Sequence, residues 1–416
     1  MACNMKNKKS IIDVIQCVLL ALSPILHMYR FISIITVGEL TLLICVLISI
    51  FTCKNLLLDY FARVFILLTY FFAITFLGTI VFKSDAFNSF KEYLAFFIYY
   101  LFAFYLVNKV NIQMFLYYYE KIALICALCV IVQFVAYTFF NIHISGLIPN
   151  ATTYFGNSTN FYIAKESNRC AGFFTEPAMC ARYLGIPFLA GIAKTKRMLS
   201  INNMLFSLAI LFTLTGNGII TLIIGYALLI ILLFKDKKMV SIGRMLLTIF
   251  TIVILVISLY HIALFKAFFG RIGEITGNST FHSGYIRIVR GFVAYLNLPI
   301  ENKIFGIGFG NYDNVMNLYF YDSITEKVNM INSWLNGIQT YLVFGGAVGV
   351  ILFLYLTMPR FFRGNRIQKS VFILLFAYLF VAGIFNDPLW LIFIVIIFSS
   401  FDKGGLRNGV SNYTDS

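Results

Sequence analysis

The chain contains 416 residues, of which 60% are hydrophobic and 12% charged, and it carries a formal net charge of +15. Because soluble domains have about a quarter charged residues, this composition excludes an ordinary soluble protein and favours a membrane protein. The positive charge is divided among short clusters between apolar segments, which argues against nucleic acid as a partner.

Apolar segments recur along the whole chain, and most are long enough to cross a bilayer, which takes about 17 to 25 residues of α-helix. Strands are not expected, because an open sheet edge leaves backbone groups unsatisfied in lipid. We therefore predict an all-α polytopic membrane protein with about 12 transmembrane helices, in a range of about 11 to 13. The expected helices are residues 11–29, 31–52, 62–82, 93–107, 122–142, 177–193, 204–215, 217–234, 245–262, 333–357, 370–385 and 388–401.

Lysines and arginines cluster in every second connection between these helices, so the clusters fall on one side of the predicted protein. By the positive-inside rule this side is the cytoplasm, which puts both termini there. The clusters are Lys6, Lys8 and Lys9; Lys54 with Arg63; Lys109 with Lys121; Lys194, Lys196 and Arg197; Lys235, Lys237, Lys238 and Arg244; Arg360, Arg363, Arg366 and Lys369; and Lys403 with Arg407.

This topology divides the chain into five parts, two of which are long loops outside the cytoplasmic membrane. Loops of this length in a compact protein are usually functional or disordered, and the composition of these two is not that of a disordered segment. The parts are residues 1–142 with helices 1–5, 143–176 as the first large loop, 177–262 with helices 6–9, 263–332 as the second large loop, and 333–416 with helices 10–12 and a cytoplasmic tail.

The first large loop ends in "RCAGFFTEPAMCARYLG" (169–185), which places Arg169, Glu176 and Arg182 beside an apolar segment. We expect a helix to begin around Pro177, because proline is tolerated in the first turn. Glu176 is either a base in a reaction or a residue that caps this helix and suits its dipole. Arg182, about 9 Å further along the helix, either binds substrate or extends its charge to the lipid headgroups.

Arginines and a carboxylate at the outer face suit a particular chemistry. Guanidinium groups bind phosphate oxygens bidentately and keep their charge, and a carboxylate can accept the proton of a hydroxyl nucleophile. Arg169, Arg182, Arg287 and Arg290 are therefore candidate pyrophosphate-binding residues, with Glu176 as the candidate base. Together they suit the transfer of a sugar from a lipid-linked pyrophosphate outside the membrane.

Other polar residues near the outer side are secondary candidates. Glu39, near the middle of the second expected helix, is either functional or a buried residue that is protonated or paired. His282 lies in the second large loop without metal-ligand spacing to another histidine, so it is equally an interfacial polar residue. No metal site and no cofactor are expected.

Several segments resemble elements of Wzy-type O-antigen and capsular polysaccharide polymerases, which belong to the O-antigen polymerase–ligase superfamily. Residues 169–185 resemble the family's Arg-x-x-Gly-x-x-x-Glu-Pro element, and "LTGNGIITLIIGYALLIILL" resembles the family's helix after a Thr/Ser-Gly turn. "HSGYIRIVRGFVAYLNLPIENKIFGIGFGNY" resembles the second outer loop, and "INSWLNGIQTYLVFGGAVGVILFL" the stretch usually written His-Asn-x-Tyr-Leu. The resemblance covers residues 165–357 in pieces, and the residues before the first loop match only in hydropathy.

The resemblance implies a glycosyltransferase-C-like, metal-independent membrane enzyme of the bacterial cytoplasmic (inner) membrane. Such an enzyme polymerises undecaprenyl-pyrophosphate-linked oligosaccharide repeat units into O-antigen or capsular polysaccharide. The resemblance also implies that Arg169, and either Arg287 or Arg290, are the counterparts of the family's functional arginines. The expected partners are the lipid-linked oligosaccharide, membrane lipids, a chain-length regulator and a flippase, with no nucleic acid. The secondary candidate residues are Glu39, His282, Gly306, Gly308, Asp313 and Asn332.

Two other functions stay open at this point. The related ligases carry a functional histidine in the His-Asn-x-Tyr-Leu stretch, and here Ile331 occupies that position. Because isoleucine cannot relay a proton, the polymerase is favoured over the ligase. A flippase or other secondary transporter also fits about twelve spans with both termini inside, although transporters keep their polar residues near the midplane. Glu39 is the residue that fits a transporter better.

Overall fold

The computed structural model is an all-α membrane protein. No strand occurs in the part of the chain that it describes, where the extended contacts are two isolated bridges, Tyr29 with Thr153 and Arg30 with Thr36. Four helices of the described residues have the length and composition needed to cross a membrane. The described residues are 11–32, 35–52, 58–149, 151–153, 169–195, 200–235, 288–289, 291–319, 335–383 and 387–399.

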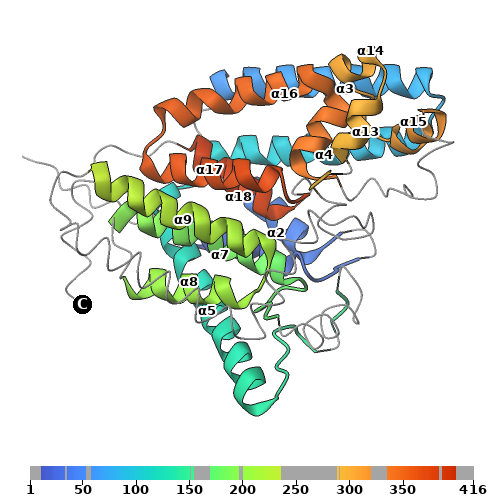
Figure 1. Ribbon diagram of the computed structural model, residues 1–416. Coiled ribbons are helices and arrows are strands. Elements are labelled where there is room, and N and C mark those ends of the chain that lie inside the picture. The colour runs from blue at the N-terminus through green and yellow to red at the C-terminus, as the bar shows by residue number, and fades with distance from the viewer. Residues whose placement is uncertain are drawn as a thin grey trace, which may run out of the picture.

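The helices follow one another as an antiparallel succession, with three short ones packed beside the end of the bundle (Figure 1). The long helices are α1 (Ile11–Leu26), α2 (Val37–Thr52), α3 (Leu58–Val81), α4 (Ala86–Lys109), α5 (Ile112–Phe140), α7 (Pro177–Thr195), α8 (Ile201–Phe212), α9 (Gly216–Lys235), α16 (Gly337–Arg363), α17 (Arg366–Leu379) and α18 (Pro388–Phe398). The short ones are α13 (Gly291–Asn297), α14 (Ile300–Phe305) and α15 (Tyr312–Tyr319).

Each expected helix that falls on described residues coincides with a helix of the structure, and the segment 245–262 lies outside them. Two of these helices, α4 and α5, begin well before the expected residue. The segment 93–107 is part of α4, which begins at Ala86 because the Asp85 side chain caps it by accepting the N–H of Phe87. The segment 122–142 is part of α5, whose start is capped in the same way by Asn111.

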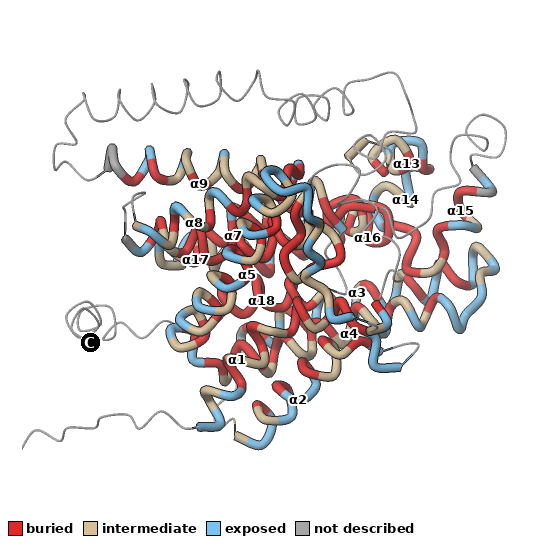
Figure 2. Tube along the Cα trace, turned by 90° about the horizontal axis from the view of Figure 1, so that it is seen from below, coloured by how far each residue is buried: buried red, intermediate tan, exposed pale blue. Residues whose placement is uncertain are grey.

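The outer surface of the bundle is apolar while its centre is closely packed. Every residue of α18 is buried, and this helix runs through the middle of the molecule (Figure 2). Large apolar side chains face outward on the surrounding helices, which is unusual for a protein in water and expected for one in lipid. Those on α2 and α3 are Leu43, Ile44, Leu47, Ile50, Phe51, Phe61, Phe65, Ile66, Phe72, Phe76, Leu77, Ile80 and Val81.

One end of the bundle collects the long connections, and we call it the loop end. There the N–H of Arg30 donates to the carbonyl of Thr152 at 2.9 Å, and Asn314 Nδ2 donates to the carbonyl of Phe82 at 3.2 Å. The described segments of the loop end are 27–32, 82–85, 141–149, 169–176, 213–215, 306–311 and 380–383.

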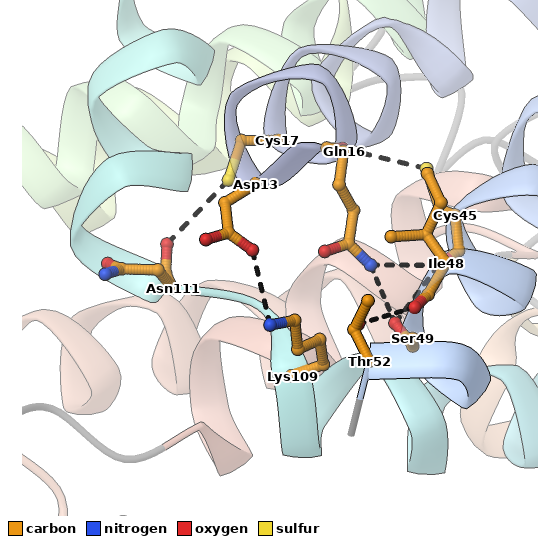
Figure 3. A network of polar contacts seen from close by, with 9 residues as sticks. All are labelled: Asp13, Gln16, Cys17, Cys45, Ile48, Ser49, Thr52, Lys109 and Asn111. Atoms are coloured by element: carbon orange, nitrogen blue, oxygen red, sulfur yellow. Dashed lines mark hydrogen bonds and ion pairs between the residues drawn. The ribbon is translucent and has the colours of Figure 1, made fainter. Parts of the chain in front are cut away.

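The opposite end carries most of the described lysines and arginines, and we call it the basic end. Its residues include Arg63, Lys109, Lys121, Lys194, Arg360, Arg363, Arg366 and Lys369. Polar contacts tie α1, α2 and α4 together there (Figure 3). Gln16 Nε2 donates to the carbonyl of Cys45 at 2.9 Å and to Ser49 Oγ at 2.7 Å, and Lys109 Nζ pairs with Asp13 at 3.3 Å.

A glycine-rich stretch joins the loop end to α3, α4 and α16. Gly306, Gly308 and Gly310 have φ angles of 84°, 73° and 71°, a region that side chains rarely adopt. The N–H of Gly308 donates to the carbonyl of Phe344 at 3.0 Å, and a Cβ on Gly308 would lie 2.5 Å from Thr75 Cα. We call these three glycines the glycine clasp, because their backbone lies directly against the helices.

Candidate functional site

A tight turn at Gly172 shapes the segment between Arg169 and α7. Gly172 has a φ of 57°, and its N–H donates to Gln133 Oε1 at 2.9 Å. Gln133 Nε2 donates in return to the carbonyls of Gly172 and Ile144, each at 3.2 Å. The side chain of α5 therefore fixes the turn on both sides, and the Arg-x-x-Gly spacing has a physical reason, since only glycine fits this conformation easily.

Arg169 and Cys170 lie just before this turn, at the loop end. Arg169 is half-buried, and the N–H of Cys170 donates to the carbonyl of Phe212 at the end of α8 at 3.3 Å. Burial raises the pKa of the Cys170 thiol to about 12. The thiol therefore stays protonated at neutral pH and does not supply a nucleophile here.

Glu176 immediately precedes α7, as the sequence predicts. Its backbone carbonyl accepts the N–H groups of Met179 and Cys180, at 3.1 and 3.3 Å. Its half-buried carboxylate makes no hydrogen bond or ion pair with the described residues, including the first-turn amides of α7. The side chain does not act as a hydrogen-bonding cap, and the carboxylate remains available at the loop end.

Arg182 lies inside the bundle rather than at its surface. It is 4% exposed, and its Nη1 lies 3.6 Å from Asp387 Oδ2. Asp387 also caps α18, because its Oδ1 accepts the N–H of Leu389 at 2.9 Å. The interpretation that Arg182 extends to the lipid headgroups is therefore wrong for this conformation, since the buried guanidinium points to the partly buried carboxylate of Asp387.

The Arg182 guanidinium keeps unused donors. Neither Nε nor Nη1 has a hydrogen-bond partner in the described part of the chain. A guanidinium offers five donors, and leaving charged donors unfilled in a buried position is costly. Arg182 therefore keeps hydrogen-bonding capacity beyond its ion pair with Asp387.

One turn along α7, another polar group is packed against the same helix. Gly185 leaves space for Tyr378, since a Cβ there would lie 2.8 Å from Tyr378 Oη. Tyr378 Oη is hydrogen-bonded to Thr221 Oγ1, which donates to the carbonyl of Asn217 at 2.7 Å. Gly185 of α7 therefore lies directly against a hydrogen bond that joins α9 to α17.

Glu39 is not near the middle of a helix, because α2 begins only at Val37. Its Oε2 accepts the N–H of Thr36 at 2.8 Å, and its own N–H donates to Thr36 Oγ1 at 3.1 Å. This reciprocal pattern is a capping box. Tyr99 Oη adds a hydrogen bond to Oε1 at 3.4 Å. The pairing explains the carboxylate at this position without a functional role.

The secondary candidates of the second loop have different surroundings. Gly306 and Gly308 belong to the glycine clasp, where the backbone packs against helices and does not surround a site. Asp313 is exposed in the first turn of α15. Arg287, Arg290, His282 and Asn332 lie outside the described residues.

The residues next to the two second-loop arginines lie on the start of α16. Gln339 Nε2 donates to the carbonyl of Ile288 at 2.9 Å, and a Cβ on Gly291 would lie 2.3 Å from Gln339 Oε1. The N–H of Gly337 donates to the carbonyl of Ala382 at 2.9 Å, which links this region to the connection that leads to Asp387. Ile288 and Gly291, which lie next to the second-loop arginines, are therefore at the loop end, as is the segment that begins at Arg169.

Sequence reasoning missed two residues that organise this region. Asp387 was not a candidate, although an aspartate before proline at the start of an apolar run is a helix-capping signal. Gln133 was not one either, because a glutamine inside an apolar helix gives no local sign of its partner. Both act on segments far away in the chain.

Comparison with known proteins identifies no relative: no protein-family model matches the chain, and no curated protein matches it. In the described part of the chain, no group of three or more His, Cys, Asp or Glu side chains is arranged to hold a metal ion.

Proposed function

We propose that the chain is a membrane glycosyltransferase that polymerises polyprenyl-pyrophosphate-linked oligosaccharide units outside the cytoplasmic membrane. Undecaprenyl pyrophosphate is the carrier that the resemblance to Wzy-type polymerases implies. The growing chain would leave its lipid pyrophosphate and pass to the next lipid-linked unit.

One observation carries this proposal. A carboxylate without a hydrogen-bonding partner in the described residues, Glu176, lies at the loop end in the same short stretch of sequence as two arginines. Arg169 precedes it across the turn that Gln133 fixes, and Arg182 follows it on α7 with unfilled donors. This combination supplies both a base and charge for a phosphate group.

The chemistry assigned to these residues is a displacement at the anomeric carbon. A sugar hydroxyl of the acceptor attacks that carbon while the bond to the pyrophosphate oxygen breaks. Glu176 accepts the hydroxyl proton, and the guanidinium groups stabilise the charge that develops on the departing pyrophosphate. The second-loop arginines Arg287 and Arg290 complete the proposed phosphate clamp.

Cell-free polymerisation with purified protein and lipid-linked repeat units tests the proposal. A polymerase produces a ladder of lipid-linked chains that lengthens with time, without any other protein. A ligase would need a different acceptor and would leave the units unextended. Failure to extend units whose structure matches the organism's own polysaccharide would contradict the proposal.

Transport of lipid-linked units is the second candidate function, and the Arg182–Asp387 pair favours it. Ion pairs inside a membrane bundle often mark transport pathways. The same purified protein in vesicles distinguishes the two functions, because a transporter moves labelled units across the bilayer and does not lengthen them.

The phosphate clamp gives a mutational test of the proposed enzyme. Arg169→Lys and Arg287→Lys keep the charge but lose the bidentate geometry, so each is expected to lower the polymerisation rate by roughly 10²- to 10³-fold. The ladder from cells with matched protein levels measures this. Unchanged chain length and total polymer in both variants would remove the clamp from the mechanism.

A further inference from the structure

Part of the predicted second large loop lies between the helices instead of beyond their ends. The short helices α13 and α14 lie alongside α16 (Figure 1). Their segment starts at the loop end, where Gln339 Nε2 near the start of α16 donates to the carbonyl of Ile288. It reaches Phe305, whose carbonyl accepts the Tyr70 hydroxyl at 2.7 Å. Because Tyr70 lies midway along α3, the segment extends from the loop end well into the bundle.

The depth of Phe305 follows from two helices that have the length and composition to cross a membrane, α3 and α16. From Tyr70 to the loop-end terminus of α3 at Val81 the helix rises about 16 Å, at 1.5 Å per residue. The same hydroxyl donates to the carbonyl of Gly345, which lies about 12 Å from the start of α16 at Gly337. Half of the hydrocarbon core is about 15 Å thick. Phe305 is therefore at a depth that corresponds to the acyl chains of one leaflet.

The chain returns to the loop end through the glycine clasp. Gly308 packs against the backbone of Thr75, and Asn314 Nδ2 then donates to the carbonyl of Phe82 beyond the end of α3. The segment thus enters the bundle and leaves it on the same side. We call residues 291–314 the re-entrant segment.

The backbone of the clasp is suited to this depth. Non-helical backbone occurs within a bilayer only where it is buried in protein and its polar groups are satisfied there. The five consecutive N–H groups of the clasp donate to the carbonyl of Asn302 (from Gly306, 2.8 Å), the carbonyl of Val343 (from Ile307, 3.0 Å), the carbonyl of Phe344 (from Gly308, 3.0 Å), Thr75 Oγ1 (from Phe309, 3.1 Å) and Glu92 Oε2 (from Gly310, 3.0 Å). These N–H groups therefore need no water.

The other side of the re-entrant segment is an exposed apolar surface. Leu296, Ile300 and Ile304 recur every four residues, and the first two are 64% and 62% exposed. Phe305 is 51% exposed, and the surface continues on α3 at Ile66, one turn from the tyrosine that holds Phe305. A contiguous apolar surface of this kind is unfavourable in water and expected in lipid.

The charged residues of α13 and α14 are compatible with lipid. They are Glu301, which is exposed, and Lys303, which is half-buried. Their charges are opposite, so these two helices carry no net charge, and both residues precede Phe305. Long charged side chains can keep their apolar stems in lipid while the charged groups reach the headgroups.

We propose that the re-entrant segment is inserted into the leaflet on the side of the loop end. Leu296, Ile300, Ile304 and Phe305 contact the acyl chains, while the glycine clasp holds the segment from within the bundle. Lipid is favoured over a soluble protein partner as the occupant of this surface, because a soluble partner does not reach the depth of Tyr70. The insertion is independent of the proposed enzymatic function.

Photo-crosslinking of the full-length protein in phospholipid vesicles tests the insertion. The photo-reactive amino acid p-benzoylphenylalanine is introduced singly at Phe305 or Ile300, and lipid adducts are measured by mass spectrometry after irradiation. Phe65, exposed in the middle part of α3, is the positive control, and Asp313, exposed in the first turn of α15, is the loop-end control. We expect the adduct yield at Phe305 to be within about threefold of that at Phe65 and roughly tenfold or more above that at Asp313.

Ile300 is the second position in case the change at Phe305 disturbs folding, because Ile300 lies outside the contact with Tyr70. Size-exclusion chromatography in detergent shows which variants are folded. Adduct yields at both positions that match Asp313, while Phe65 reacts with lipid, would overturn the insertion. Crosslinks from these positions to a second copy of the chain instead of lipid would also overturn it, and would assign the surface to a protein contact.

Discussion

At the scale of single residues, the two charged residues near the start of α7, Glu176 and Arg182, have different surroundings. The Glu176 carboxylate has no partner in the described residues, whereas Arg182 is held by Asp387 within the bundle. A buried ion pair contributes little net stability, because its Coulomb energy mainly offsets the cost of desolvating both charges. Keeping such a pair therefore points to a use for the remaining donors of Arg182.

The role of Glu176 can be tested by Glu176→Gln. This change preserves volume and removes the ability to accept a proton, so it is expected to lower polymerisation by roughly 10²- to 10⁴-fold. Membrane insertion and protein level should stay normal, because the carboxylate makes no hydrogen bond with the described residues that the change would break. Polymer ladders and immunoblots measure the two effects. Near-normal chain extension would exclude Glu176 as the base.

The burial of the Arg182–Asp387 pair predicts a large effect on stability. Asp387→Asn can still cap α18, but it leaves the buried Arg182 charge without its counterion. We expect a loss of about 3 to 5 kcal/mol, measured by thermal unfolding in detergent.

Asp85→Asn is the matched control for this change, because Asp85 caps α4 without a buried ion pair. It is expected to change stability by no more than about 0.5 kcal/mol, since asparagine caps as well as aspartate. Similar losses in the two variants would show that Asp387 acts only as a cap.

At the scale of elements, the glycine clasp connects the second-loop region to helices from both halves of the chain. Tyr70 Oη on α3 donates to the carbonyls of Phe305 and Gly345, at 2.7 and 2.8 Å. Gly346, with a φ of 64°, kinks α16 beside the same region. These contacts fix how the short helices α13 to α15 pack on α3, α4 and α16.

Gly308→Ala is expected to break this arrangement. The new Cβ would meet backbone atoms of α3 and would also impose an unfavourable positive φ. Overpacking costs about 1 to 3 kcal/mol, and the left-handed conformation costs about 1 to 2 more. Thermal unfolding in detergent measures the loss.

Gly216→Ala is the control for the clasp, because nothing lies within 4 Å of a Cβ added at the start of α9. It is expected to leave stability unchanged or slightly increased, since alanine favours a helix. A stable Gly308→Ala protein would show that the clasp is looser than its contacts indicate.

At the scale of the whole molecule, most of the described lysines and arginines lie at the basic end of the bundle, opposite the loop end. If the basic end is cytoplasmic, both large loops and Glu176 are outside. The proposed enzyme depends on this orientation, because it extends its lipid-linked substrate outside the cytoplasmic membrane.

Reporter fusions test the orientation. Alkaline phosphatase fused after Ser158 or after Tyr312 is expected to be active, and a fusion after Asn365, between α16 and α17, is expected to be inactive. Fluorescent-protein fusions at the same positions should give the opposite pattern. Phosphatase activity after Asn365, or its absence after Ser158, would reverse the orientation and contradict the proposed mechanism.

The sequence by itself determined where helices form. A long apolar run in lipid must satisfy its backbone hydrogen bonds within the segment, so hydropathy alone locates α3, α7 and α9 to within a few residues. It also placed Glu176 at the start of α7, because proline in a first turn is a local signal. Hydropathy did not predict the early start of α4, because the first turns of this helix are polar. The helix begins there because the Asp85 side chain caps it.

Only the tertiary structure decided which polar groups meet. Asp387 pairs with Arg182, and Gln133 accepts a hydrogen bond from the turn at Gly172. The backbone N–H of Thr36 donates to the Glu39 carboxylate. The first two contacts join helices that are distant in sequence, so no local pattern contains them. The contact between Thr36 and Glu39 follows from the start of α2 at Val37. Hydropathy does not locate this start, because the connection before α2 is apolar too. Packing between helices therefore determined which charges are satisfied and which remain available for a substrate.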